Sequence, residues 1–366
     1  MIDPASFGQV VLLSTAISIL TTIGTFGQHR TILHYTTAQA YQSYGALATA
    51  MGYAIILVFF GFFVLEWFQG SIPNAILLVA LLAIFHSLLS TQRRAFEDVK
   101  NFAFLRASLS ICRLVLVVGT LLTFHDVSAY IAAEAVAIVL SLTFSARIVL
   151  SIGTESKDVS LARLIKSGKI GAPLLIRAIL VMTITHYDKL LLARVGQYDQ
   201  LGQYGMLYMI AASVSFVAAF IGIKYEPEIY QSGSDRSAFA AANNYQKRLL
   251  LTQGILAVSV TIIWQIGQPI IMPDRTLVWF ILPLLFGGQI FSQSVIPWSS
   301  FLTRTAALLA QTISVFVAAV ASLLLNTLLI PEYGPTGAAI TFLAANMIYF
   351  ALIYCAGQLQ IRNSDR

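Results

Sequence analysis

Long apolar runs separated by short polar connections set the pattern of this chain. Each run is continuous and about as long as the roughly 20 residues that a helix needs to cross the hydrocarbon of a bilayer. A helix satisfies its own backbone hydrogen bonds in lipid, so the runs predict membrane-spanning α-helices. We expect eleven spans, near residues 7–24, 44–66, 72–90, 104–123, 127–150, 169–187, 204–223, 249–267, 277–299, 304–326 and 336–358.

The composition supports the same fold class. Of the 366 residues, 58% are hydrophobic and only 10% are charged, and the mean hydropathy is +0.80. A single soluble core cannot hide that much apolar surface. We therefore expect an all-α polytopic membrane protein.

The basic residues indicate how the spans are oriented. Of the 22 Lys and Arg, seventeen fall on one side of the predicted spans, three on the other side and two inside spans. Lys and Arg concentrate in cytoplasmic loops, which places the C-terminus in the cytoplasm and the present N-terminus outside. The net charge of +6 then reflects topology and contact with anionic lipids, and does not indicate nucleic-acid binding. Trp298 is expected at an inner helix end, in an interfacial aromatic belt.

Two halves are expected along the chain. The polar connection 151–168 is predicted to be a cytoplasmic linker between an N-terminal transmembrane bundle, 1–150, and a C-terminal bundle, 169–366. Gly8-Gln9 and Gly202-Gln203 each open a span, which indicates parallel repeats. The second copy follows a complete helix and the first does not. We therefore expect two pseudo-symmetric bundles of a twelve-helix design from which the first helix is missing. The charge count supports this view, because one more helix before residue 7 would put the N-terminus in the cytoplasm.

Two patches carry a resemblance to a known family. The first joins the last two spans, and the second follows the span 169–187. They read Leu325-Asn326, Ile330-Pro331-Glu332-Tyr333-Gly334 and Gly337-Ala338-Ala339, and Asp188-Lys189-Leu190-Leu191-Leu192, Gly196 and Gly202-Gln203-Tyr204. Pro331 cannot continue a helix and Gly334 permits a tight turn, so a turn near 331–334 is also expected on physical grounds alone.

These patches resemble the Wzx-type polysaccharide flippases of the multidrug/oligosaccharidyl-lipid/polysaccharide exporter (MOP) superfamily. The resemblance implies a multi-pass protein of the bacterial cytoplasmic (inner) membrane. It also implies that the chain flips an undecaprenyl-pyrophosphate-linked oligosaccharide, an O-antigen or exopolysaccharide repeat unit, by alternating access. The implied partners are this lipid-linked substrate, membrane lipids and the polysaccharide polymerase machinery.

Charged residues inside or beside the spans are the candidate site residues, because burying charge in a bilayer is costly. Arg177 and Asp188 are eleven residues apart, which places them on one helix face with a rise of about 16 Å between them. We expect Arg177 and the pair Asp188-Lys189 to bind substrate, since a guanidinium suits a pyrophosphate. In the alternative interpretation, Arg177 snorkels inward and the pair only begins an outer loop.

Three other charges have different expected roles. Arg113 and Glu134 lie at comparable depths in successive spans, so we expect an interhelical ion pair that locks the bundle. Arg30 closes the first span on the cytoplasmic side. There it either meets an arriving head group or is an ordinary positive-inside residue.

Sequence motifs for chemistry are missing. The chain carries no Walker A loop, no dinucleotide-binding glycine pattern, no G-x-S-x-G elbow and no paired Cys or His at metal-ligand spacing. We therefore expect no catalytic residue, no metal and no cofactor, and a transporter in place of an enzyme. The alternatives are a lipid II flippase or a multidrug antiporter of the same superfamily, and less favourably a membrane polysaccharide polymerase or ligase.

Overall fold

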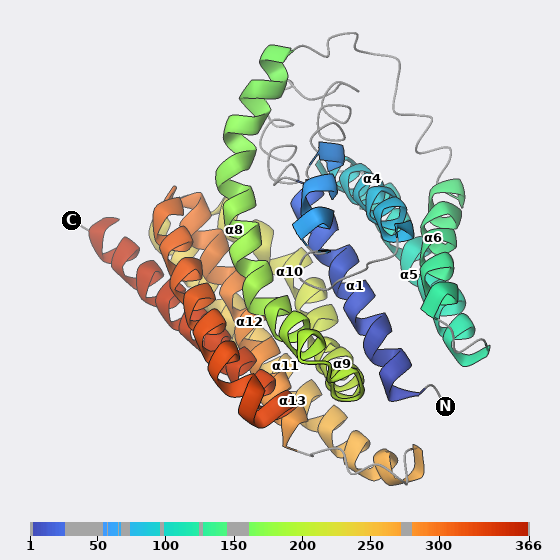
Figure 1. The fold of residues 1–366 in the computed structure, drawn as a ribbon. Helices are drawn as coiled ribbons and strands as arrows, with labels where there is room; N and C mark the ends of the chain where they lie inside the picture. The colour runs from blue at the N-terminus through green and yellow to red at the C-terminus, as the bar shows by residue number, and fades with distance from the viewer. Residues whose placement is uncertain are drawn as a thin grey trace. The chain divides into compact units, whose positions relative to one another are not determined.

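The structure is a computed structural model that describes residues 3–25, 54–56, 58–64, 66, 74–95, 99–123, 127–144, 161–271 and 280–364. Within these ranges the regular elements are all helices (Figure 1): α1 (Pro4–Thr25), α4 (Ala75–Ala95), α5 (Val99–Thr123), α6 (Val127–Phe144), α8 (Leu161–Arg194), α9 (Tyr198–Ala212), α10 (Val214–Gln231), α11 (Asp235–Ile271), α12 (Ile281–Arg304) and α13 (Leu308–Ser364).

The prediction of an all-α, multi-pass membrane protein is confirmed. Five of the described helices are long and apolar enough to cross a membrane by length and composition, namely α1, α6, the stretch Tyr198–Gly222, α11 and α13. The expected span 44–66 lies largely outside the described residues, and its described parts are helical. The observed helices extend past several predicted spans, because hydropathy marks only the part of a helix that lipid covers.

The last helix consists of two spans joined at a glycine. α13 contains 57 residues, and its backbone leaves helical geometry at Gly334, where φ is 53° and ψ is −130°. A residue without a Cβ adopts this conformation at little cost. A Cβ on Gly337 would lie 2.4 Å from the carbonyl oxygen of Leu329, so the chain approaches itself closely after the turn. The turn predicted for 331–334 is confirmed.

The chain divides into two compact units, Met1–Ile179 and Leu180–Arg366. The division falls inside α8. The predicted boundaries at 150 and 169 stay predictions, because residues 145–160 lie outside the described ranges and the chain is already helical at Leu161.

In the first unit, α4 lies between α1, α5 and α6 and packs against each of them. Its buried side chains Ile76, Ile84, Leu88 and Leu89 provide much of the apolar core. A small polar cluster crosses this core, in which His86 Nε2 lies 3.1 Å from Ser141 Oγ.

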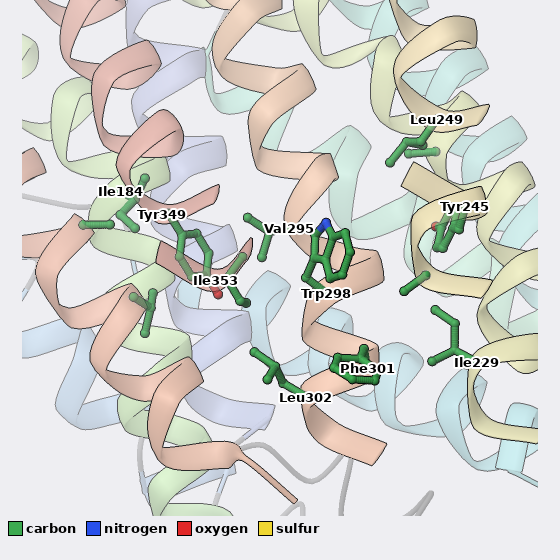
Figure 2. Packing of buried hydrophobic residues seen from close by; sticks show 14 of the residues in the cluster. Ile184, Ile229, Tyr245, Leu249, Val295, Trp298, Phe301, Leu302, Tyr349 and Ile353 are labelled. Carbon is green, nitrogen blue, oxygen red and sulfur yellow. The ribbon is translucent and has the colours of Figure 1, made fainter. Parts of the chain in front are cut away.

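In the second unit, α12 is the central helix and packs against α9, α10, α11 and α13. Figure 2 shows Trp298 of α12 between Tyr245 on one side and Tyr349 and Ile353 on the other. The Trp298 side chain is fully buried, and its ring meets that of Tyr354 edge-on with 4.9 Å between centroids. The expectation of an interfacial role for Trp298 was wrong, because aromatic side chains from neighbouring helices enclose it.

Buried polar side chains bond α12 to its neighbours. Gln311, which is fully buried on α13, accepts a hydrogen bond from Ser299 Oγ at 3.1 Å and donates to Thr303 Oγ1 at 3.0 Å. Toward α10, Gln293 Nε2 donates to Ser215 Oγ at 3.2 Å. Hydrogen bonds between helices hold membrane bundles together where apolar burial gives little preference for one partner.

Candidate functional site: a buried ion pair at the end of helix α8

The end of α8 is closed by a glycine that turns the chain back. Gly196 has φ +78°; its N–H donates to Ala193 O at 3.0 Å, and the N–H of Gln197 donates to Leu192 O at 3.3 Å. These two bonds form a Schellman motif, in which a left-handed residue satisfies the last carbonyls of the helix. Because the chain reverses here, α9 begins at Tyr198 and returns along the last turns of α8.

Asp188 and Lys189 lie in these last turns and are almost completely buried, with exposed fractions of 1% and 3%. Lys189 Nζ lies 3.4 Å from Asp188 Oδ1 and donates a hydrogen bond to Thr185 O at 2.7 Å. Two opposite charges in one buried place form a neutral pair, whereas either one alone would be strongly destabilising.

Two tyrosines of α9 complete the surroundings of the pair. The hydroxyl of Tyr204 donates a hydrogen bond to Asp188 Oδ2. The ring of Tyr208, one helical turn further on, lies with its centroid 3.6 Å from Lys189 Nζ. An aromatic face attracts a cation, most strongly away from water. We call Asp188, Lys189, Tyr204 and Tyr208 the α8–α9 cage.

The cage also touches α13. The ring of Tyr208 meets the ring of Phe342 edge-on, with 5.4 Å between centroids. Phe342 in turn lies against Gly288 of α12, where a Cβ would come within 2.3 Å of the Phe342 ring. A displacement of Tyr208 would therefore disturb the packing of the core of the second unit.

The predicted substrate-binding residues are in different settings. Asp188 and Lys189 contact each other and two tyrosines instead of facing an open surface, so a ligand would meet them only if the cage opened. Arg177 is half-buried on α8. Arg30 lies outside the described residues. Substrate binding by these four residues stays a prediction.

The predicted pair of Arg113 and Glu134 is brought together in the first unit. Arg113 Nη2 of α5 lies 2.5 Å from Glu134 Oε1 of α6. The carboxylate side chain is 8% exposed and the guanidinium side chain is 42% exposed. The contact joins two neighbouring helices, and its role in locking the bundle stays a prediction.

Sequence analysis did not assign a role to Tyr208 and used Tyr204 only as part of a motif. Tyr204 and Tyr208 are four residues apart in the helix that follows Gly196, so both lie on one face of that helix. This spacing was the sequence signal that could have identified them. The sequence does not show which charges this face of α9 contacts, because the packing of the helices decides it. In the part of the chain that the structure describes, no group of three or more His, Cys, Asp or Glu could hold a metal ion.

The fold of the chain is similar to that of solved MATE transporters. No protein-family profile and no curated protein matches the chain. A multidrug resistance MATE family transporter of the MOP superfamily, solved facing inward, is similar over 99% of this chain and 91% of its own, with a TM-score of 0.63 and 12% identity.

Two further solved structures are similar. A MOP superfamily transporter from Pyrococcus furiosus aligns over 99% of this chain and 88% of its own, with a TM-score of 0.53 and 12% identity. A mutant of a Vibrio cholerae MATE transporter aligns over 97% and 86%, with a TM-score of 0.53 and 14% identity. At these identities the likeness establishes the fold.

Proposed function

We propose that this chain is a membrane transporter that flips an undecaprenyl-pyrophosphate-linked oligosaccharide from the cytoplasmic to the outer leaflet by alternating access. The MATE/MOP fold supports transport in general. The choice of cargo depends on the polysaccharide-flippase resemblance of residues 325–339 and on Arg177.

Arg177 is the observation that carries the choice of an anionic cargo. It is half-buried and belongs to the predicted span 169–187, and a charge inside a span usually serves a pathway or a partner. A guanidinium donates forked hydrogen bonds to phosphate oxygens, which a lysine ammonium does not reproduce. The cage at Asp188 and Lys189 lies further along the same helix and supplies no free charge in the described arrangement.

Complementation tests the proposal. In a bacterial strain that lacks its polysaccharide flippase, the chain should restore surface polysaccharide. Arg177→Gln should abolish the restoration and Arg177→Lys should weaken it, with membrane insertion unchanged. Arg194→Gln, which removes an exposed cation from the last turn of the same helix, is the matched control and should retain activity. Full activity of Arg177→Gln would remove this residue from the cargo path.

A multidrug antiporter is the second candidate, favoured by the similarity to the inward-facing multidrug resistance MATE transporter. The two candidates differ in their cargo, because a cationic or neutral drug would gain nothing from the positive charge of Arg177. The same strains separate the two. Lowered accumulation of a cationic dye, without surface polysaccharide, would favour the antiporter and refute the flippase.

A further inference from the structure

Two neighbouring helices of the second unit present a continuous apolar surface. On α10, Phe216 and Phe220 are 70% and 74% exposed. Five of the exposed apolar side chains of α11 recur every three or four residues and so form one stripe; they are Leu251, Ile255, Val258, Ile262 and Ile266. In a membrane protein, a stripe of this kind is the face that meets acyl chains.

The exposed faces of α10 and α11 form one apolar surface, which we call the wall. α10, α11 and α12 pack against one another in pairs, so the exposed sides of α10 and α11 both point away from α12. The helices are antiparallel, because Gln253 Nε2 donates to Val214 O at 3.4 Å while the rings of Tyr225 and Tyr245 stack with 6.0 Å between centroids. This register puts Phe220 at the depth of residues 247 to 250.

Basic side chains border the wall at that depth. Lys247 and Arg248 are exposed, and at 100° per residue they lie about 40° and 60° to either side of Leu251. Neither forms an ion pair within the described ranges of the chain. Lys224 is exposed one turn beyond Phe220 on α10, and the exposed carboxylate on that helix face, Glu228, lies one further turn away from the wall.

We propose that the corner formed by Lys224, Lys247 and Arg248 at the edge of the apolar surface is a binding site for an anionic phospholipid. Lys247, Arg248 and Lys224 bind the phosphate and the anionic head group, and the acyl chains lie along Phe220 and Leu251. Arginine and lysine both suit phosphate oxygens, and the site lies where the sequence places the cytoplasmic leaflet, which carries the negative surface potential. The proposal does not depend on which cargo the transporter moves.

Lipid binding can be measured directly. The purified full chain would be placed in nanodiscs of phosphatidylcholine alone or of an equal mixture with phosphatidylglycerol, and retained lipid counted by native mass spectrometry. The unaltered chain should retain phosphatidylglycerol selectively. The double variant Lys247→Gln, Arg248→Gln should lose this selectivity, with affinity about 30-fold lower, at roughly 1 kcal/mol per basic residue.

The control is Arg362→Gln, which removes an exposed cation from the last turn of α13 and should leave selectivity unchanged. If the double variant does not fold in phosphatidylcholine, the single variant Arg248→Gln replaces it, with an expected loss of about fivefold. Undiminished selectivity in these variants would overturn the proposal, because Lys247 and Arg248 would then not hold the lipid. An equal loss in Arg362→Gln would also overturn it, because binding would then depend on overall charge.

Discussion

Removing one member of the buried pair should be far more damaging than removing both. Asp188→Asn leaves the Lys189 ammonium in a place that is 3% exposed, and a buried charge that loses its partner costs about 3–5 kcal/mol. We expect the lower end, about 3 kcal/mol, because the Tyr208 ring and Thr185 O still stabilise the cation. Lys189→Met should cost about as much, since it strands the carboxylate.

The double variant Asp188→Asn, Lys189→Met removes both charges and keeps an oxygen that can accept the hydrogen bond of the Tyr204 hydroxyl. Its loss should be about 1 kcal/mol, since neutral replacements of a buried ion pair are often close to neutral. The free energy of unfolding of the four proteins, measured by denaturant titration in detergent, gives the coupling between the two sites. A double variant as unstable as the single variants would refute the view that unpaired charge is the cause of the loss.

The same double variant separates structure from cargo binding. If the cage only holds α9 against α8, the stable double variant should still complement the flippase-deficient strain. If Lys189 leaves the cage to meet a pyrophosphate, the double variant should be folded and inactive. Normal activity in a folded double variant would remove Asp188 and Lys189 from the predicted substrate-binding residues.

Two further predictions concern the helix turns. Gly337→Ala should destabilise the protein by about 1–3 kcal/mol, because its Cβ would meet the Leu329 backbone; Gly254→Ala, whose Cβ meets nothing within 4 Å, is the control and should not lower the melting temperature in detergent. Ala306 ends α12 in the left-handed conformation, at φ 57°, in the same motif as Gly196. Ala306→Gly should therefore stabilise by up to about 1 kcal/mol and Gly196→Ala should destabilise by about 1 kcal/mol; melting shifts of equal sign would contradict this.

The fold was predictable because each apolar run reports directly on how one helix meets lipid. The turn at Gly334 was predictable for a local reason, the combination of a proline that stops a helix and a glycine that permits an unusual φ. The meeting of Arg113 and Glu134 could be anticipated from depth alone, since successive helices of a bundle usually pack side by side.

The position of a residue along its span did not predict how the rest of the candidate site is buried. Asp188 and Lys189 stand near the end of a span, so the sequence allowed an exposed outer loop, and only the return of α9 through Gly196 buries them under Tyr204 and Tyr208. Trp298 was expected at the interface because of its residue type, and it lies in the core because Phe239 of α11 and Tyr354 of α13 pack against its ring. Hydropathy describes one helix in lipid and carries no information on which neighbour will cover which face.

The polar side chains of α12 bear on how the protein enters the membrane during synthesis. α12 is not among the five described helices that are long and apolar enough to span by composition, since Gln293, Ser299 and other polar groups interrupt it. A helix of this kind gains less from lipid alone, and its polar atoms find partners in Ser215, made earlier, and Gln311, made later. The centre of the second unit is therefore a segment whose polar side chains find these partners only once helices translated both before and after it are in place.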